Sequence, residues 1–358
     1  MKVDLPAPFG PKTPKNSPEW TSTFNGWRAI KSPYFLAISS AFTKGAVSLI
    51  FGLNCPILCN IGLNHNRINL QGDCSGRTMD APKSDVLSIE QVAVSDEELN
   101  GFIALATINR PNKLNALNSE VMDALKNFCE WAEADTGIRC VVITGAKPLQ
   151  PTEGKRPKPN AFVAGADISE FVDMDSKAAK IKFTENAVEA IWNLTKPSIA
   201  MIDGFALGGG CEVACSCDIR IASKRSKFGT PEINLGLIPG YGATQRLSKL
   251  VGYGKTLELI MTGEMISAEE AEKIGLINQV CANEELYDIT MNMANVIASK
   301  SVFIAKAAKR TIRASLNNSL DEGVAIEADE FAKLFDSDDK VEGVKSFMAR
   351  TKPNWRDS

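Results

Sequence analysis

Apolar residues form short unbroken runs and helical patterns along most of the chain. Residues 102–108, FIALATI, are an apolar run closed by Pro111, which predicts a buried strand. From Ser119 onward apolar positions recur every three or four residues, which predicts a helix that begins at this capping residue. Similar patterns predict short strands at 140–144, 161–163 and 197–202 and a long helix at 178–194. Strands that alternate with helices favour a parallel sheet and an α/β fold.

Beyond residue 267 the pattern is mostly helical, and no internal repeat is visible. Amphipathic spacing predicts helices near 268–274, 283–299, 302–316 and 320–335. We therefore expect three parts in the chain, namely an N-terminal extension over 1–85, a core over 86–282 and a C-terminal helical region over 283–358.

The N-terminal extension differs from the rest in composition, because residues 1–80 hold eight Lys and Arg against four Asp and Glu. A basic, acid-poor, Ser-containing leader is typical of an organelle transit peptide. A poorly ordered extension and a misassigned start, with Met79 as the first residue, stay open as alternatives. The uncharged run 45–66 could be interpreted as a membrane span, but Pro56 and four asparagines disfavour that interpretation.

The charged residues nearly balance, with 40 Lys and Arg against 43 Asp and Glu among 358 residues, so nothing favours nucleic acid binding. The chain has one histidine, His65, which disfavours Ser-His-Asp, Cys-His and His-rich metal chemistry. Its nine cysteines indicate reduced thiols packed in a core. Cys211, Cys215 and Cys217 are clustered but lack the second cluster that a zinc site needs, so no metal is expected.

Two glycine-marked turns each follow a predicted strand, at 164–168 (AGADI) and at 204–212 (GFALGGGCE). A strand-to-helix turn leaves backbone N–H groups free, and glycine lets a ligand approach them closely. Two such turns that face each other could donate two hydrogen bonds to one oxygen, which is an oxyanion hole. Taken singly, each is better interpreted as an ordinary turn, and neither has the G-x-G-x-x-G spacing of dinucleotide sites.

Two glutamates lie in or beside these glycine-rich segments. Glu212 interrupts an apolar run at 211–215, and Glu232 lies in the segment 228–236, FGTPEINLG. Each alone could be a surface or capping residue. Together, in a chain with no candidate catalytic histidine, they indicate paired carboxylate acid–base chemistry.

From about residue 86 to its end the chain resembles the enoyl-CoA hydratases of the crotonase superfamily, whereas the first 85 residues have no counterpart. The matching segments, in the family's order, are 109–117 (NRPNKLNAL), 161–168 (AFVAGADI), 208–212 (GGGCE), 228–232 (FGTPE), 236–240 (GLIPG) and 244–247 (TQRL). Residues 268–275 resemble the segment that follows in the family, and 335–355 resemble its C-terminal helix.

The resemblance implies a crotonase-like spiral of ββα units with a C-terminal helical region that serves assembly as a trimer or a dimer of trimers. It implies that Glu212 and Glu232 are the catalytic acid and base and that the amides of Ala166 and Gly209 form the oxyanion hole. Gly240 would help to place the water. The implied substrate-binding residues are Lys113, Leu114, Ala166, Asp167, Ile168, Ser169, Gly209 and Gly240.

The implied reaction is the reversible syn addition of water to a short-chain 2-enoyl-CoA, which gives a 3-hydroxyacyl-CoA. Coenzyme A belongs to the substrate, and no separate cofactor, nucleic acid or membrane partner is expected. Superfamily members that only isomerise commonly keep one of the two carboxylates, so the presence of both favours a hydratase. A double-bond isomerase or another enolate-forming acyl-CoA enzyme stays open, as does a catalytically silent binding or assembly protein. The expected compartment is the cytoplasm, or the mitochondrial matrix if the extension is a transit peptide.

One segment departs from the family pattern. Residues 147–160 lengthen the loop before the first glycine turn and carry Lys147, Lys155, Arg156 and Lys158. These cations could contact the phosphates of coenzyme A, although a solvated loop is the simpler interpretation.

Overall fold

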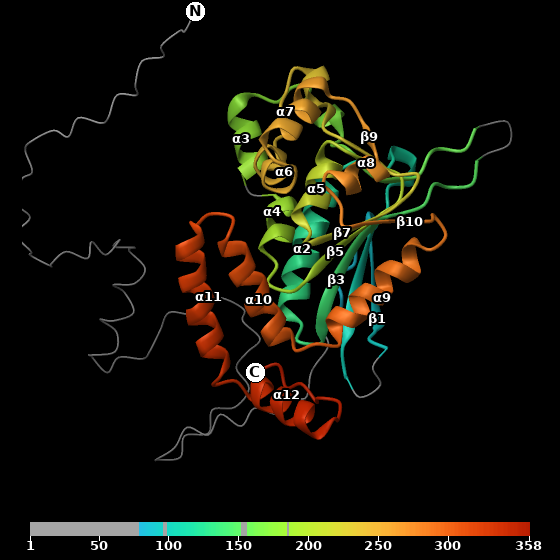
Figure 1. Cartoon of the computed structure of the whole chain (residues 1–358). Helices are drawn as coiled ribbons and strands as arrows, with labels where there is room; N and C mark the ends of the chain where they lie inside the picture. Colours follow the sequence, from blue (N-terminus) through green and yellow to red (C-terminus); the bar gives the residue numbers. More distant parts are fainter. Residues whose placement is uncertain (1–78, 96–98, 152–155, 185) are drawn as a thin grey trace, which may run out of the picture. The chain divides into compact units, whose positions relative to one another are not determined.

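The computed structural model describes residues 79–358 except 96–98, 152–155 and 185 (Figure 1). His65, the uncharged run 45–66 and all but the last seven residues of the predicted extension lie outside this range. None of the described helices combines the length and apolar character that crossing a bilayer requires.

Strands and helices alternate through the first two thirds of the described chain, and helices dominate after that (Figure 1). The strands are β1 Leu87–Ala93, β2 Phe102–Ile108, β3 Ile138–Gly145, β4 Ala161–Ala164, β5 Ser198–Ile202, β6 Phe205–Leu207, β7 Ile219–Ser223, β8 Lys227–Gly229, β9 Ile266–Ser267 and β10 Gln279–Cys281. The α-helices are α2 Ser119–Ala134, α3 Ser176–Thr184, α4 Ala187–Asn193, α5 Gly209–Ser216, α6 Ala243–Val251, α7 Tyr253–Thr262, α8 Ala268–Lys273, α9 Leu286–Ala298, α10 Val302–Ala314, α11 Leu320–Leu334 and α12 Asp338–Ala349. The 3-10 helices are η1 Pro111–Lys113, η2 Ile168–Phe171 and η3 Pro231–Leu235.

The larger sheet has the strand order β1-β2-β3-β5-β7-β10, with β1 antiparallel to β2 and the other neighbours parallel. Alternate side chains point to opposite faces, so Ile103 and Leu105 join a core under α9 while Ala104 and Ala106 join the core under α2 and α4. Figure 1 shows α9 and α2 on opposite faces of this sheet. The predicted parallel sheet is confirmed, and β1 is an antiparallel edge strand that the sequence pattern did not indicate.

The smaller sheet has the order β4-β6-β8-β9, in which β4, β6 and β8 run parallel. The three parallel strands end side by side, and the chain leaves them through the two glycine turns and through η3. Helix α5 lies close against β4, because a Cβ on Gly210 would come within 1.9 Å of the Val163 carbonyl oxygen. This sheet therefore brings three chain segments, far apart in sequence, to one edge.

The long helix predicted at 178–194 is wrong, because the chain forms α3 and α4 there instead. Asn186 begins α4, and its side-chain oxygen accepts the N–H of Glu189. The same side chain donates to the carbonyl oxygen of Phe183 at the end of α3. Asparagine prefers such capping positions, and this local hydrogen bonding overrides the continuous apolar pattern.

The second glycine turn is also shorter than predicted. Strand β6 occupies part of the predicted segment 204–212, so the turn itself lies at Gly208. A three-residue strand is too short to produce a recognisable alternation.

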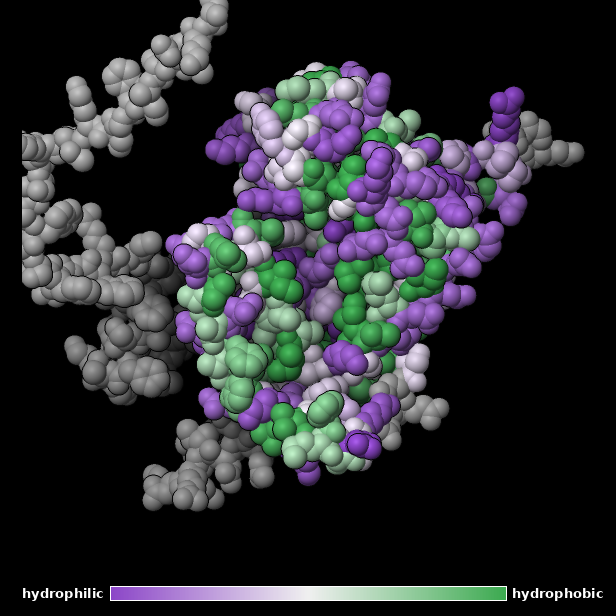
Figure 2. Space-filling model, viewed as in Figure 1, coloured by the Kyte–Doolittle hydropathy of each residue, from purple (hydrophilic) through white to green (hydrophobic). Residues whose placement is uncertain are grey.

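Four helices, α9 to α12, form the C-terminal part, in agreement with the predicted helical pattern. Figure 2 shows hydrophobic side chains gathered over α10, α11 and α12. Among them Leu320, Phe331 and Phe347 are 82%, 63% and 85% exposed. The boundary predicted at 282/283 stays a prediction, and α9 packs on β2, β3 and β5 of the larger sheet.

Candidate active site

A cavity of about 390 Å³ lies where β4, β6 and β8 end. It is lined by Ala164, Gly165, Ala166, Ile168, Phe171, Met174, Ala179, Phe183, Gly208, Gly209, Glu212, Pro231, Glu232, Leu235, Leu237, Ile238, Gly240 and Tyr241. Six of the residues singled out from the sequence meet here, namely Ala166, Ile168, Gly209, Glu212, Glu232 and Gly240. The four others, Lys113, Leu114, Asp167 and Ser169, do not line this cavity.

Two backbone amides at the cavity are free to donate. Ala166 forms a parallel bridge with Leu117 in which the amides of Leu117 and Asp167 make the hydrogen bonds, so the Ala166 N–H faces the other way. Gly209 is the first residue of α5, where the amide has no partner within the helix. Within the described chain neither amide donates a hydrogen bond. A Cβ built on Gly209 would lie 3.7 Å from the Ala166 nitrogen, so the two donors are neighbours.

Asp167 supports the first turn and does not face the cavity. One of its carboxylate oxygens lies 3.1 Å from Arg110 Nη2 and the other accepts the hydroxyl of Ser169. The hydrogen bonds from Ser169 and Arg110 lower the pKa of Asp167. Leu114 contributes through its backbone, because its carbonyl oxygen accepts the N–H of Ala164. The segment after β2 therefore holds the turn in place, and Arg110 is a supporting residue that we did not identify from the sequence.

Glu212 lies on α5 and is only 1% exposed. Its Oε1 accepts two backbone hydrogen bonds, from Tyr241 N at 2.7 Å and from Ala243 N at 3.0 Å. The pKa of Glu212 is raised to about 7, chiefly by burial and also by the nearby charge of Glu232, while the N–H bonds from Ala243 and Tyr241 oppose the rise. A carboxyl group with such a pKa can gain or lose a proton near neutral pH.

Glu232 lies on η3, and within the described chain its buried Oε2 has no hydrogen-bond partner. Burial raises the pKa of this carboxyl as well. Its Oε1 lies only 2.9 Å from the place that a Cβ on Gly208 would take. Gly208 has φ +51°, so the turn uses both the free space and the conformational freedom of glycine. A buried carboxylate oxygen without a partner is costly unless a ligand or water binds it.

The segment that binds Glu212 is itself held by Arg246 on α6. Arg246 Nη1 donates to the Tyr241 carbonyl oxygen at 2.6 Å, and its Nη2 forms an ion pair with Glu189. The guanidinium carbon lies 4.9 Å from the centre of the Trp192 ring, a cation–π contact. These contacts fix the backbone amide of Tyr241 and thereby the orientation of the Glu212 carboxyl group. The sequence segment TQRL contains Arg246, but its spacing does not reveal this role.

Replacement of Glu212 by Gln is expected to change how stability depends on pH. In the folded protein the pKa of Glu212 is about 7 against an ordinary value of 4.5, so folding favours the protonated form. The wild type therefore loses stability as pH rises from 4.5 to 7, whereas Glu212→Gln has no proton to lose at this site. The free energy of unfolding of Glu212→Gln, relative to that of the wild type, is expected to rise by about 3 kcal/mol over this range and then to stay constant. Urea unfolding at several pH values measures this difference, and a pH-independent difference would contradict the raised pKa.

The predicted contacts of the loop at 147–160 stay a prediction. Lys147, Arg156 and Lys158 are exposed, and Lys155 lies outside the described residues. Lys158 Nζ donates to the carbonyl oxygen of Asn112. The structure thus gives Lys158 a partner within the chain.

Across the described ranges, no group of His, Cys, Asp and Glu side chains is arranged to hold a metal ion. The described cysteines are buried free thiols, among them Cys211, Cys215 and Cys217. The cavity's chemistry, as far as the protein supplies it, is therefore that of two carboxyl groups and two amides.

Comparisons with known proteins agree on one family. Residues 98–358 match the family model described as Enoyl-CoA hydratase/isomerase. The short-chain-enoyl-CoA hydratase of Clostridium acetobutylicum is 40% identical over 257 residues, which cover 71% of this chain and 94% of the relative. The crotonyl-CoA hydratase of Syntrophomonas wolfei is 35% identical over 271 residues, 75% of this chain and 99% of the relative. The crystal structure of an enoyl-CoA hydratase from Bacillus anthracis superposes with a TM-score of 0.68 at 30% identity, over 76% of this chain and 100% of that one.

Proposed function

The chain belongs to the enoyl-CoA hydratase/isomerase family of the crotonase superfamily, and we propose that it adds water to short-chain 2-enoyl-CoA thioesters with Glu212 and Glu232 as its acid and base. It is an enzyme of the hydro-lyase class with a crotonase fold, and its substrate is an acyl-CoA. The names of the relatives from C. acetobutylicum and S. wolfei support a short acyl chain.

One observation carries the proposal, namely that two free amides, the buried carboxyl group of Glu212 and the half-buried carboxyl group of Glu232 line the same cavity. Addition of water to an enoyl thioester builds enolate charge on the thioester oxygen. The amides of Ala166 and Gly209 are placed to donate to that oxygen, and each such donor stabilises the transition state by about 3 kcal/mol. Stabilisation of the enolate thus needs only backbone groups that the fold already holds in place.

The carboxyl groups divide the proton transfers between them. The pKa of both is raised, mainly by burial, and that of Glu212 is about 7, so Glu212 can take up or release a proton near neutral pH. Hydration needs Glu212 in its ionised form and Glu232 in its protonated form. The two N–H bonds to Glu212 Oε1 stabilise the ionised form there, whereas the buried Oε2 of Glu232 has no donor in the described chain that would stabilise its ionised form. Glu212 takes a proton from water while the water oxygen bonds to C3, and Glu232 gives its proton to C2. The reverse sequence removes water from a 3-hydroxyacyl-CoA, and both directions use the same residues.

The presence of both carboxyl groups in one cavity also distinguishes the candidate activities. Movement of a double bond needs one group that shuttles a proton, whereas hydration needs a second group for the water. The hydratase is therefore the better supported activity. A double-bond isomerase is the alternative.

The proposed activity is tested by mixing the purified chain with crotonyl-CoA and following the loss of the enoyl thioester absorbance in the ultraviolet. We expect 3-hydroxybutyryl-CoA as the product, identified by mass. In D₂O the product should carry one deuterium at C2, on the same face as the new hydroxyl group. Formation of a 3-enoyl thioester without any gain of water would support the isomerase instead.

Assembly as a trimer or a dimer of trimers is part of the same proposal. Exposed apolar side chains on α11 and α12, such as Leu320, Phe331 and Phe347, support burial against other copies. Light scattering should give a mass that is a multiple of three chains, and a monomer at micromolar concentration would contradict this. The compartment, cytoplasm or mitochondrial matrix, stays a prediction.

A further inference from the structure

Three aromatic side chains that line the active-site cavity, Phe171, Phe183 and Tyr241, form a continuous wall. Phe183, at the end of α3, packs on Tyr241 with ring centroids 4.5 Å apart, and Phe171 meets Phe183 edge-on at 5.9 Å. The Phe183 ring also lies against Gly240, where a Cβ would come within 2.7 Å of it. Tyr241 is only 3% exposed. The wall is therefore made of rings that support one another and the backbone beside Glu212.

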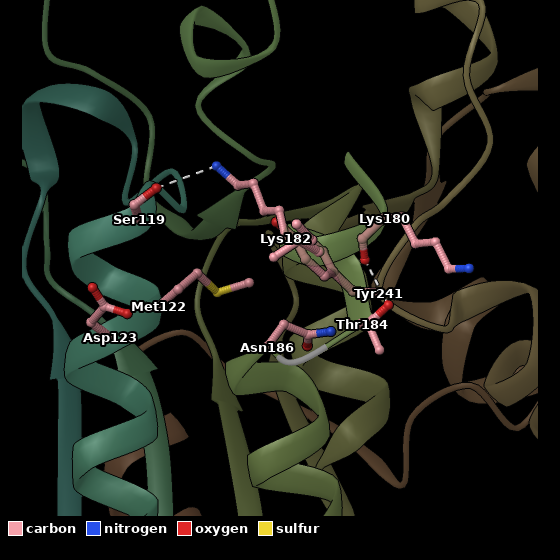
Figure 3. A pocket seen from close by; sticks show the side chains of 9 residues that line it. Ser119, Met122, Asp123, Lys180, Lys182, Thr184, Asn186 and Tyr241 are labelled. Atoms are coloured by element: carbon pink, nitrogen blue, oxygen red, sulfur yellow. Dashed lines mark hydrogen bonds between the residues drawn. The ribbon is translucent and has the colours of Figure 1, made fainter. Parts of the chain in front are cut away.

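A second cavity of about 520 Å³, which Tyr241 also lines, lies between α2 and the end of α3 (Figure 3). It is lined by Ser119, Met122, Asp123, Lys180, Ile181, Lys182, Thr184, Asn186 and Tyr241. Lys180 and Ile181 are exposed, so this outer cavity opens to solvent. Tyr241 is the one residue that lines both cavities in the described structure.

The placement of the reacting groups fixes the direction of the acyl chain. In the proposed reaction the thioester oxygen accepts from the amides of Ala166 and Gly209, and C3 must lie beside Glu212. The Tyr241 amide donates to Glu212 Oε1 at 2.7 Å, so Tyr241 adjoins the place of C3. Carbons beyond C3 therefore extend toward Tyr241 and Phe183, and a longer chain meets the wall.

We propose that Phe183, supported by Tyr241, limits the length of the acyl chain that this enzyme accepts. The proposal rests on the proposed function. With the ring in place the acyl chain ends inside the inner cavity. A smaller side chain at this position removes the ring that packs on Tyr241, the residue that lines both cavities, and gives a longer chain room toward the outer cavity between α2 and α3.

Phe183 is the better residue to vary, because Tyr241 holds Glu212 through its backbone. Helix α3, which carries Phe183, has no fully buried residue, and Phe183 packs only against the edge of the main core, so we expect a smaller side chain there to be tolerated. Each methylene that gains an apolar contact contributes about fourfold to kcat/KM. A chain that is six carbons longer than crotonyl therefore needs only two or three such contacts to raise its kcat/KM tenfold.

The experiment measures kcat/KM with crotonyl-CoA and with trans-2-decenoyl-CoA for the wild type, Phe183→Leu and Phe183→Ala. The wild type should prefer crotonyl-CoA. The decenoyl-to-crotonyl ratio should rise at least tenfold in Phe183→Ala and by an intermediate factor in Phe183→Leu. Lys177→Ala, which changes an exposed residue of α3 that lines neither cavity, should leave the ratio within twofold of the wild type.

A ratio that stays within twofold in both Phe183 variants overturns the proposal, as does a wild type that accepts both substrates equally. If Phe183→Ala does not fold, the ratio of Phe183→Leu decides. If the wild type hydrates crotonyl-CoA and neither Phe183 variant changes the decenoyl-to-crotonyl ratio, the proposed function stays intact. A wild type that hydrates no enoyl-CoA overturns the proposed function, and the chain-length limit with it.

Discussion

Replacement of Glu232 by Gln is expected to lower kcat for crotonyl-CoA hydration by about 10²–10⁴-fold. Glutamine has the size and shape of the glutamate side chain, but its amide cannot give a proton to C2. The Oε2 atom of Glu232 is buried and has no partner in the described chain, so no neighbouring group is placed to take over its task. KM should change much less than kcat, because the lost interaction forms mainly in the transition state.

A matched control is Glu264→Gln, because Glu264 is an exposed glutamate that does not line the cavity. This control should keep wild-type kcat. Thermal melting of both variants checks that the fold is retained. A Glu232→Gln enzyme with at least a tenth of wild-type kcat would show that another group delivers the proton.

Removal of one oxyanion donor is expected to have the next largest effect. Gly209→Pro deletes the N–H at the first residue of α5, a helix position that proline ordinarily occupies without loss of helix stability. The loss of one such donor lowers kcat by about 10²–10³-fold. Gly209→Ala is the matched variant, because it keeps the N–H and adds a Cβ that meets Leu117 Cδ1 at 3.1 Å.

The difference between these two variants measures the contribution of the amide. Leu117 Cδ1 is the end of a side chain that can move by a few tenths of an ångström, so Gly209→Ala should stay within about tenfold of the wild type. Equal losses in Gly209→Ala and Gly209→Pro would mean that space, and not the N–H, matters at this position.

The candidate site could be predicted from local patterns to the extent that its chemistry is local. Glu212 interrupts an apolar run, and a charged residue in that setting is expected to be partly buried; in the structure its burial is almost complete. The free amides of Ala166 and Gly209 could also be predicted, because both residues lie in turns that follow a strand, and such turns leave backbone N–H groups without partners. The resemblance of these segments to the family's motifs indicated which residues act as acid, base and oxyanion donors, which the spacing alone did not show.

The supporting contacts could not be predicted in this way. Glu212 is held by amides 29 and 31 residues further along the chain, and Arg110 reaches Asp167 across 57 residues. Such pairs form only when the strands of the smaller sheet end side by side. The break at Asn186 was missed because one capping side chain outweighs an apolar pattern that continues on both sides of it.

The central claim is that Glu212 and Glu232 act together in one turnover. The most direct measurement compares kcat for crotonyl-CoA hydration in Glu212→Gln, in Glu232→Gln and in the double variant. If the two carboxyl groups act as a unit, each single variant should lose about 10²–10⁴-fold, and the double variant should lose little more than the poorer single one. A single variant that retains wild-type kcat would contradict the account.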